Sequence, residues 1–250
     1  MSLQSRLDAL RDNRTSGAID LALEALDIAE DWFGSGRAAA ELTAALETMH
    51  PAIATVRNVA RELQSGSSDT GSRIAGIRES LRNGNRIIAS KVAALIPARS
   101  VVITISNSST VRDALIAVGP RGVHVMESHP GGEGAAMADA LRSALGNRPG
   151  HEFVELIPDD AIEQYVPHCD CALLGIDTFD GTGAIWHKLG TLRLAQLCHE
   201  IGRPFYAAGH SLKQSVQELA ETPPLDAKTG AQLFDRTPGE LITEIITESR

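Results

Sequence analysis

Small polar side chains follow the apolar run "VVITI" at residues 101–105 and precede a segment with helical spacing. They form the sequence "SNSST", in which Ser106, Ser108 and Ser109 carry hydroxyl groups. A serine at the start of a helix can cap the first turn, and the free N–H groups of that turn can bind an anion such as phosphate. Ser108 and Ser109 are therefore candidate phosphate ligands, although capping alone would also explain them.

Two further loops hold residues that could take part in the same chemistry. "ESHPGGEG" begins with Glu127 and ends with Gly134, and "GIDTFDGTGAIWHKLGT" holds Asp177, His187 and Lys188. We expect Lys188 at the start of a helix, where its ammonium could meet a phosphate as a point charge. Asp177 directly follows an apolar run and could face the ligand. The alternatives are a turn or cap residue for Asp177 and a solvated helix surface for Lys188.

The remaining motifs indicate neither a nucleotide cofactor nor a metal. The "GTG" of residues 181–183 lacks the third glycine and the downstream acidic residue of a dinucleotide fingerprint. Cys169 and Cys171 are one residue apart in an apolar run, so on a strand they would point to opposite faces. Together with Cys198 they are expected to be buried structural cysteines rather than metal ligands.

The elements that must position these loops change character near Pro97. Residues 1–96 place apolar residues at helical intervals, with breaks at residues 34–36 and 65–71, which predicts an all-helical first domain. Residues 97–250 alternate short apolar runs with helical patterns, which predicts a Rossmann-like α/β domain. The expected strands are residues 101–105, 122–127, 152–157, 171–176 and 204–208. Helices are expected to begin near Ser109, Glu133, Asp159, Lys188 and Leu212.

The expected strands are almost continuously apolar, which is typical of strands buried on both faces. Such strands form a mostly parallel sheet that helices cover on both sides. Ligands bind to sheets of this kind at the carboxyl ends of the strands. The three polar loops are therefore expected to converge on one crevice.

Composition and charge narrow the classes of partner. The chain has 250 residues, 43% of them hydrophobic, and a formal net charge of −9. Nucleic-acid backbones and anionic membranes attract proteins through positive potential, so neither is an expected partner. Three cysteines cannot form an even disulfide framework, and no signal-like segment precedes the first helical pattern. We therefore expect a cytoplasmic protein, in which any anionic small ligand would need local donors.

Several segments resemble one known family. The stretch from "GIDTFDGTGAIWHKLGT" to "RPFYAAGHSLK" is similar to the family pattern "GAD…NG…NKIGT…A…PFYV", and "FDRTPGELITEIITE" is similar to "FDVTPPELIT-IITE". "VMESHPGGEGAAMADAL" is similar to "ESRP--QG--LA". These patterns are shared by the alpha, beta and delta subunits of translation initiation factor 2B, methylthioribose-1-phosphate isomerase and archaeal ribose-1,5-bisphosphate isomerase. The resemblance covers residues 97–250, and only "NRTSGAIDLALEAL" is loosely similar to the earlier "IRGA" segment.

The resemblance places Asp177 on the catalytic aspartate of the isomerases, which convert an aldose 1-phosphate to a ketose 1-phosphate. It places Ser106 on their catalytic cysteine. A serine hydroxyl is a far weaker acid than a thiol with a pKa of about 8.5, so Ser106 would be a poor proton carrier without a dedicated base. Lys188 is retained. The other departures from the family pattern replace two arginines and an asparagine, by Ser16, His129 and His187.

The sequence thus leaves two main hypotheses for the function. The first is a binding protein related to the initiation-factor subunits, whose pocket takes a sugar phosphate or a nucleotide. The second is an aldose-ketose isomerase that acts on a sugar 1-phosphate. A structural subunit with a vestigial pocket is a third alternative. The resemblance further implies a homodimer or larger assembly through residues 97–250, and a translation factor as a protein partner.

Overall fold

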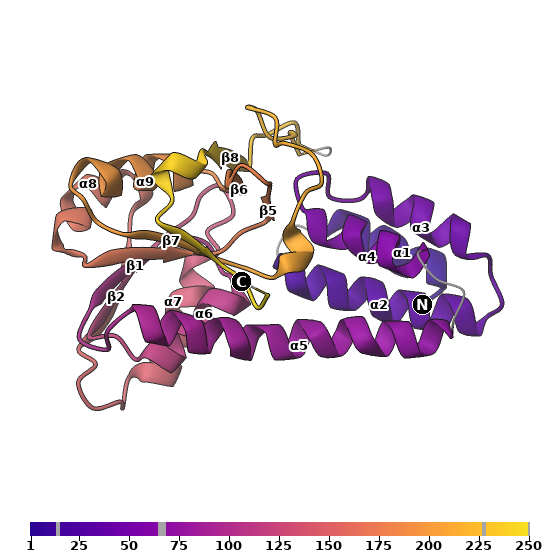
Figure 1. Ribbon diagram of the computed structural model, residues 1–250, viewed down its shortest axis with the longest axis horizontal. Coiled ribbons are helices and arrows are strands. Elements are labelled where there is room, and N and C mark those ends of the chain that lie inside the picture. The colour runs from indigo at the N-terminus through magenta and orange to yellow at the C-terminus, as the bar shows by residue number, and fades with distance from the viewer. Residues whose placement is uncertain (14–15, 65–68, 227–228, 250) are drawn as a thin grey trace.

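The computed structural model describes residues 1–13, 16–64, 69–226 and 229–249. Five helices come first in the described chain, and Figure 1 shows the earliest of them, in indigo and violet, packed beside the rest of the molecule. Their apolar residues form one core around Trp32. The helices are α1 (Leu3–Asp12), α2 (Ala18–Gly34), α3 (Ala39–Thr48), α4 (Ala54–Gln64) and α5 (Thr70–Leu95).

The helical spacing of α4 explains its packing. Val56, Val59, Ala60 and Leu63 are buried, and they recur every three or four residues, which places them on one face of the helix. The break expected at residues 34–36 is confirmed by the end of α2 at Gly34. The break expected at residues 65–71 lies partly outside the described residues.

A turn between α3 and α4 was not predicted. It occupies residues 49–53 and contains Pro51, which has no N–H to donate within a helix and which excludes the helical conformation from the residue before it. Proline within a helical pattern is the signal that could have shown this break. The turn matters for the site, because its residues form one wall of the main pocket.

Helix α5 is long enough to contact both the first helices and the sheet, as Figure 1 shows. Ile74 and Leu81 pack into the core of the first helices, whereas Ile88 and Val92 pack against the sheet. The division of the chain into two domains near Pro97 therefore stays a prediction.

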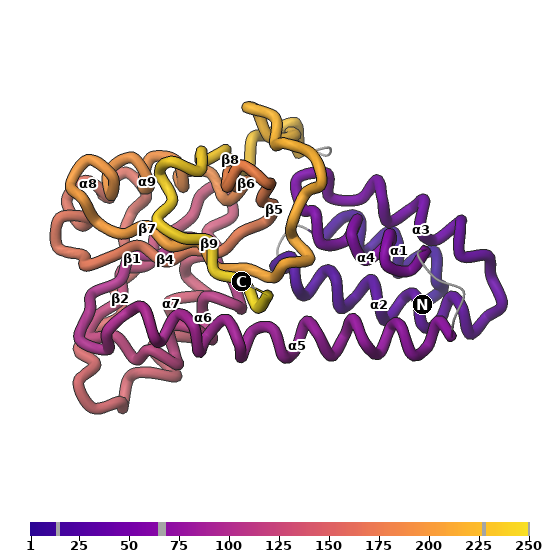
Figure 2. Tube along the Cα trace, in the orientation of Figure 1, coloured from indigo at the N-terminus to yellow at the C-terminus, as the bar shows by residue number. Residues whose placement is uncertain are grey.

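The predicted Rossmann-like α/β fold is confirmed. Six parallel strands form one sheet in the order β3-β2-β1-β4-β7-β9. Five of them are the strands expected from the sequence, and the edge strand β9 is an addition, visible beside β7 in Figure 2. The strands are β1 (Val101–Thr104), β2 (Gly122–Met126), β3 (Phe153–Ile157), β4 (Cys171–Leu174), β7 (Phe205–Ala208) and β9 (Glu244–Ile246).

Helices cover both faces of this sheet. One core lies between the sheet and α5, α6 (Ser109–Val118) and α7 (Gly134–Leu145). The other lies between the sheet and α8 (Ile162–Tyr165) and α9 (Thr191–Glu200). Four short 3₁₀ helices complete the described helical segments: η1 (Asp159–Ala161), η2 (Val166–His168), η3 (Ser211–Lys213) and η4 (Gly239–Leu241).

The expectation that Lys188 begins a helix is wrong. Lys188 is the last residue of β6 (Ile185–Lys188), which pairs in an antiparallel manner with β5 (Thr178–Phe179) and β8 (Phe234–Thr237). Helix α9 begins only at Thr191. This small sheet has little signal in the sequence, because β5 is two residues long and β8 lies far along the chain. Because Lys188 lies on a buried strand rather than at the start of a helix, its backbone is held by pairing with β8.

The strand order has its switch point between β1 and β4. These strands are neighbours, and the chain moves outward from β1 through β2 to β3 before it returns to β4 on the other side. Open α/β sheets bind ligands at such a switch point, outside the carboxyl ends of the strands. Ser106 follows β1 and Asp177 follows β4, so the topology brings both residues to this switch point.

The cysteines lie as the sequence predicts. All three are buried, with Cys171 in the core on one face of the sheet and Cys169 and Cys198 in the core on the other. Burial raises the pKa of each thiol to about 12. Within the described ranges, no group of three acidic, histidine or cysteine side chains could hold a metal ion. No described helix is long and apolar enough to cross a membrane.

Candidate functional site

A pocket of about 320 Å³ opens at the carboxyl ends of the sheet strands, against the first helices. A smaller hollow of about 40 Å³ adjoins it. Ser106, Asn107 and Asp177 line both of them. The lining of the larger pocket alone includes residues 48–53, Gly131, Glu133, Lys188, Leu225 and Phe234. The lining of the smaller hollow alone includes Ser108, Ser109, His187 and Lys213.

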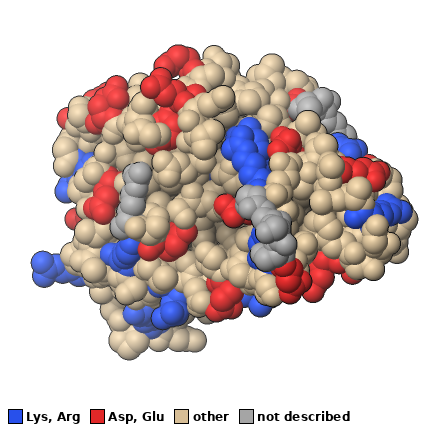
Figure 3. Space-filling view, turned by 45° about the vertical axis from the view of Figure 1, so that its right-hand side comes forward, with Lys and Arg blue, Asp and Glu red and all other residues tan. Residues whose placement is uncertain are grey.

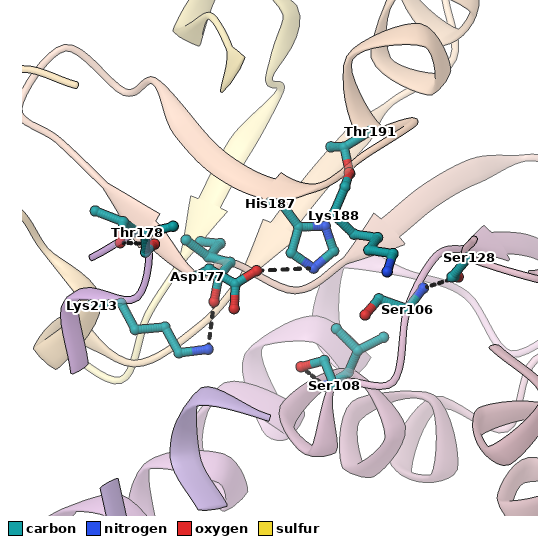
Figure 4. Close-up of polar contacts among 12 residues, drawn as sticks. Ser106, Ser108, Ser128, Asp177, Thr178, His187, Lys188, Thr191 and Lys213 are labelled. Atoms are coloured by element: carbon teal, nitrogen blue, oxygen red, sulfur yellow. Dashed lines mark hydrogen bonds and ion pairs between the residues drawn. The ribbon is translucent and has the colours of Figure 1, made fainter. Parts of the chain in front are cut away.

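Asp177 is the acidic group at the centre of the site, with a side chain that is 18% exposed. Burial raises its pKa to about 6, the ammonium groups of Lys213 and Lys188 oppose this rise, and the Glu133 carboxylate adds to it. An acid with a pKa close to neutral can both accept and release a proton. Figure 4 shows the Asp177 carboxyl between Lys213 and His187.

His187 is neutral at pH 7. Burial lowers its pKa to about 3, with a further contribution from the positive charges of Lys213 and Lys188. The Thr191 hydroxyl donates to the Lys188 carbonyl oxygen at 2.6 Å, so the same hydroxyl accepts from His187 Nδ1–H at 3.0 Å. This leaves the unprotonated His187 Nε2 facing Asp177 Oδ2, 4.0 Å away. His187 therefore offers Asp177 no positive charge.

Two buried lysines flank the site. Lys188 Nζ lies 2.8 Å from Glu133 Oε1, and its side chain is only 6% exposed. Lys213 Nζ donates to the Ile176 carbonyl oxygen, directly before Asp177. Burial lowers the pKa of Lys213, and nearby carboxylates, that of Asp177 first among them, oppose this. The centre of the site thus combines these two ammonium groups with the carboxyl groups of Asp177 and Glu133, and Arg11 and Asp226 also line the larger pocket.

Ser106 has a left-handed backbone, with φ of 70°, and so does Ser128, with φ of 68°. Non-glycine residues adopt this conformation rarely, and those that do cluster at functional sites. The Ser106 N–H donates to Ser128 Oγ at 2.7 Å, and Ser128 Oγ donates to the Met126 carbonyl oxygen at 2.9 Å. This contact fixes the ends of β1 and β2 together and directs the Ser106 hydroxyl toward the pocket, as Figure 4 shows.

Ser108 caps helix α6, as the sequence allowed. Its hydroxyl accepts from the Val111 N–H at 3.4 Å. Gly175 permits the close approach of this turn to β4, because a Cβ atom there would lie 2.8 Å from Ser108 Cβ and 3.1 Å from His187 Nε2. Ser109 is the first helical residue and lines the smaller hollow together with Ser108.

Glu127 and Gly134 do not line either hollow. The Gly134 N–H donates to the Glu127 carbonyl oxygen at 3.2 Å, and a Cβ at Gly134 would lie 1.8 Å from the Met126 carbonyl oxygen. Gly134 therefore serves the packing of α7 on β2. The Glu127 carboxylate lies 3.4 Å from His129, whose side chain is 67% exposed.

Three parts of the site were not predicted from the sequence: Lys213, Glu133 and the turn at residues 49–53. Lys213 ends the sequence "PFYAAGHSLK", so it follows strand β7 as the other candidate residues follow their own strands. Treating that strand end in the same way would have found it. Glu133 lies in the "ESHPGGEG" loop that was already singled out, but its partner is 55 residues away.

Thr178, next to Asp177, ties the pocket wall to the sheet. Its buried hydroxyl accepts from the Ala54 N–H at 2.9 Å and donates to the Ala52 carbonyl oxygen at 2.9 Å. We expect Thr178→Val to lower the free energy of unfolding by about 1–3 kcal/mol, because two buried backbone groups lose their partner. Urea denaturation measures this, with Thr178→Ser as the control that retains the hydroxyl. Equal losses in the two variants would contradict the assignment.

The fold and the site together define a class: an open parallel α/β protein with a pocket, lined by charged and polar side chains among apolar ones, at the switch point of its sheet. The chain belongs to the initiation factor 2 subunit family, IF-2B, whose sequence model matches residues 7–223.

Two relatives and one solved structure illustrate the range of this family. A translation initiation factor eIF-2B subunit 2-like protein of Pyrococcus horikoshii is 30% identical over 83% of this chain and 78% of its own length. Ribose 1,5-bisphosphate isomerase of Archaeoglobus fulgidus is 31% identical over 59% of this chain and 52% of its own length. The crystal structure of the Pyrococcus horikoshii OT3 translation initiation factor eIF-2B matches with a TM-score of 0.85 and 27% identity, over 99% of this chain and 95% of that chain.

Proposed function

We propose that this chain is a ligand-binding member of the family, whose pocket takes a phosphorylated small molecule, either a sugar phosphate or a nucleotide. One observation carries the preference for binding over catalysis. Ser106 stands where the resemblance puts the isomerase cysteine, and no His or Lys side chain among the described residues hydrogen-bonds to its hydroxyl. A serine without a base is a poor proton carrier at neutral pH.

The groups expected to hold a phosphate lie on both sides of Ser106. Lys188 contributes a buried ammonium to the larger pocket, and the start of helix α6 at Ser109 faces the smaller hollow. The first N–H groups of a helix attract anions, and a lysine adds a full positive charge. Ser108 and Ser109 supply hydroxyl donors next to them.

The chain is further proposed to work within an assembly, as a homodimer or a larger closed oligomer, with a translation factor as a protein partner. The family description and the name of the Pyrococcus relative both use the word subunit, which supports assembly. Light scattering across a range of protein concentrations tests it.

A second candidate function, isomerisation of a sugar 1-phosphate, has one specific observation in its favour. The Asp177 carboxyl has a pKa raised to about 6 by burial and shares both hollows with Ser106. A group with that pKa could move a proton between the carbons of an opened sugar.

One experiment separates the two functions. Purified protein is incubated with a set of sugar 1-phosphates and nucleotides, and both the thermal midpoint and aldose-to-ketose conversion are measured. A binding protein gives a shift without conversion, and a ligand at 100 times its dissociation constant should stabilise the fold by about 2.7 kcal/mol. Conversion by the parent protein would favour the isomerase, and Ser106→Cys tests whether a thiol alone restores it. No shift with any compound would count against both.

A further inference from the structure

The cation best placed to bind a phosphate already has a counter-ion inside the pocket. Lys188 Nζ lies 2.8 Å from Glu133 Oε1, and both residues line the larger pocket. The Lys188 side chain is 6% exposed and that of Glu133 is 25% exposed, so solvent screens this pair only in part. Any anion that approaches Lys188 must also approach the Glu133 carboxylate.

The Glu133 side chain is held in this position by its surroundings. Glu133 directly precedes helix α7, and its carboxylate packs over Gly131, where a Cβ atom would lie 2.4 Å from Oε2. One oxygen of the carboxylate contacts Lys188. The other, Oε2, is buried and has no hydrogen-bond partner among the described residues.

The unpartnered Glu133 Oε2 indicates which kind of ligand group could form a hydrogen bond with it. A carboxylate can only accept hydrogen bonds, so the missing partner must be a donor. A buried acceptor without a partner is costly, and a ligand that donates to it removes this cost. Inorganic phosphate carries one or two P–O–H donors at neutral pH, but it also brings one or two negative charges, which the Glu133 carboxylate repels. A sugar hydroxyl would donate to it.

We propose that Glu133 is the specificity-determining residue of this pocket: its carboxylate competes with compact anions for Lys188 and accepts a hydroxyl of the ligand. The ligand class is therefore a phosphorylated polyol, bound in preference to inorganic phosphate. This inference rests on the proposed function, because it assumes that the pocket binds a phosphorylated small molecule.

The charge distribution offers a matched control. Asp139 lies on the same helix α7, its side chain is 78% exposed, and it pairs with Arg142 rather than with a pocket residue. Asp139→Asn removes one negative charge from the molecule, as Glu133→Gln does, but leaves the pocket unchanged. Figure 3 shows that acidic and basic residues are interspersed over the face drawn. Solvent and salt screen an exposed charge such as that of Asp139 far more than the partly buried charge of Glu133.

Calorimetric titration with inorganic phosphate and with ribose 1-phosphate tests the proposal. We expect the parent protein to bind ribose 1-phosphate at least about tenfold more tightly than inorganic phosphate, because the uncharged ribose hydroxyls can donate to Glu133 without bringing further negative charge to it. Glu133→Gln should bind inorganic phosphate about tenfold more tightly than the parent, since the like charge beside Lys188 is gone. Asp139→Asn should match the parent with both compounds.

Two results would overturn the inference. One is a parent protein that binds inorganic phosphate as tightly as ribose 1-phosphate, a measurement that does not depend on any variant. The other is Glu133→Gln with no greater gain in phosphate affinity than Asp139→Asn. If ribose 1-phosphate binds but the preference does not depend on Glu133, only this inference fails. If neither the parent nor Glu133→Gln binds any phosphate compound, the proposed function fails with it.

Discussion

Asp177→Asn is expected to be more stable than the parent protein at pH 7, by about 3 kcal/mol in the free energy of unfolding. The folded-state pKa of Asp177 is raised to about 6 by burial, against an ordinary value of about 3.9. Between these two values the folded protein binds more protons than the unfolded chain. The parent therefore gains stability as pH falls from about 7 to about 4, and it is least favoured where Asp177 is ionised in its buried site. The amide avoids this cost because it carries no charge.

Urea denaturation of both proteins between pH 4 and pH 8 measures this difference. The gain should be largest at pH 7 and above, and it should fall to a small remainder near pH 4, where the folded carboxyl is protonated and that of the unfolded chain is about half protonated. A gain that does not change with pH would contradict the assignment.

In binding assays the variant should retain a phosphorylated ligand, and any isomerase turnover should be lost, since an amide cannot take up the proton.

Asp180 provides a control of opposite sign, three residues along the same loop. Burial alone would raise the pKa of Asp180, but hydrogen bonds from the Thr182 hydroxyl and from the N–H groups of Leu219, Thr182 and Ala184 lower it overall. Asp180→Asn should therefore destabilise the fold at pH 7. If Asp177→Asn raises the free energy of unfolding and Asp180→Asn lowers it, the loss of a negative charge alone cannot explain either change.

The convergence of Ser106 and Asp177 was predictable because it depends on local patterns and on the general rule for parallel sheets. Strands β1 and β4 are short runs of buried apolar residues that stop at polar residues, and such runs are recognisable without knowledge of the fold. Once the sheet is parallel, their carboxyl ends lie on one edge. The strand order then makes the two neighbours.

The environment of Lys188 was not predictable in the same way, because it depends on contacts between distant parts of the chain. Strand β6 is stabilised by β8, in which Arg236 lies opposite Trp186 across a gap of 50 residues. The Glu133 partner of Lys188 directly precedes helix α7, in the loop that follows β2, and it meets β6 only through the tertiary fold. Periodicity describes neighbours along the chain and carries no information on such pairs. The turn at Pro51 differs, since its signal was present in the sequence.

Lys188→Ala is expected to weaken the binding of ribose 1-phosphate by about ten- to a hundredfold, the loss that accompanies removal of one charge-assisted hydrogen bond of about 1.5–3 kcal/mol. The start of helix α6 remains as the principal attraction for the phosphate. Arg193→Ala is the matched control: Arg193 lies on helix α9, its side chain is 47% exposed, and it pairs with Glu163 and Glu200. Its removal takes away one positive charge outside the pocket and should leave the dissociation constant unchanged.

The same substitution in the Glu133→Gln background shows whether the two side chains are energetically coupled. In the parent, the Lys188 ammonium donates to the Glu133 carboxylate, whose negative charge offsets part of the attraction of Lys188 for an anion. With Glu133→Gln that attraction is free, and Lys188→Ala should then cost more affinity for inorganic phosphate than it does in the parent. A difference between the two losses is the interaction energy of the pair in a double-mutant cycle. Equal losses in the two backgrounds would mean that Glu133 does not compete for Lys188, and Lys188→Ala that binds like the parent would mean that the phosphate lies elsewhere.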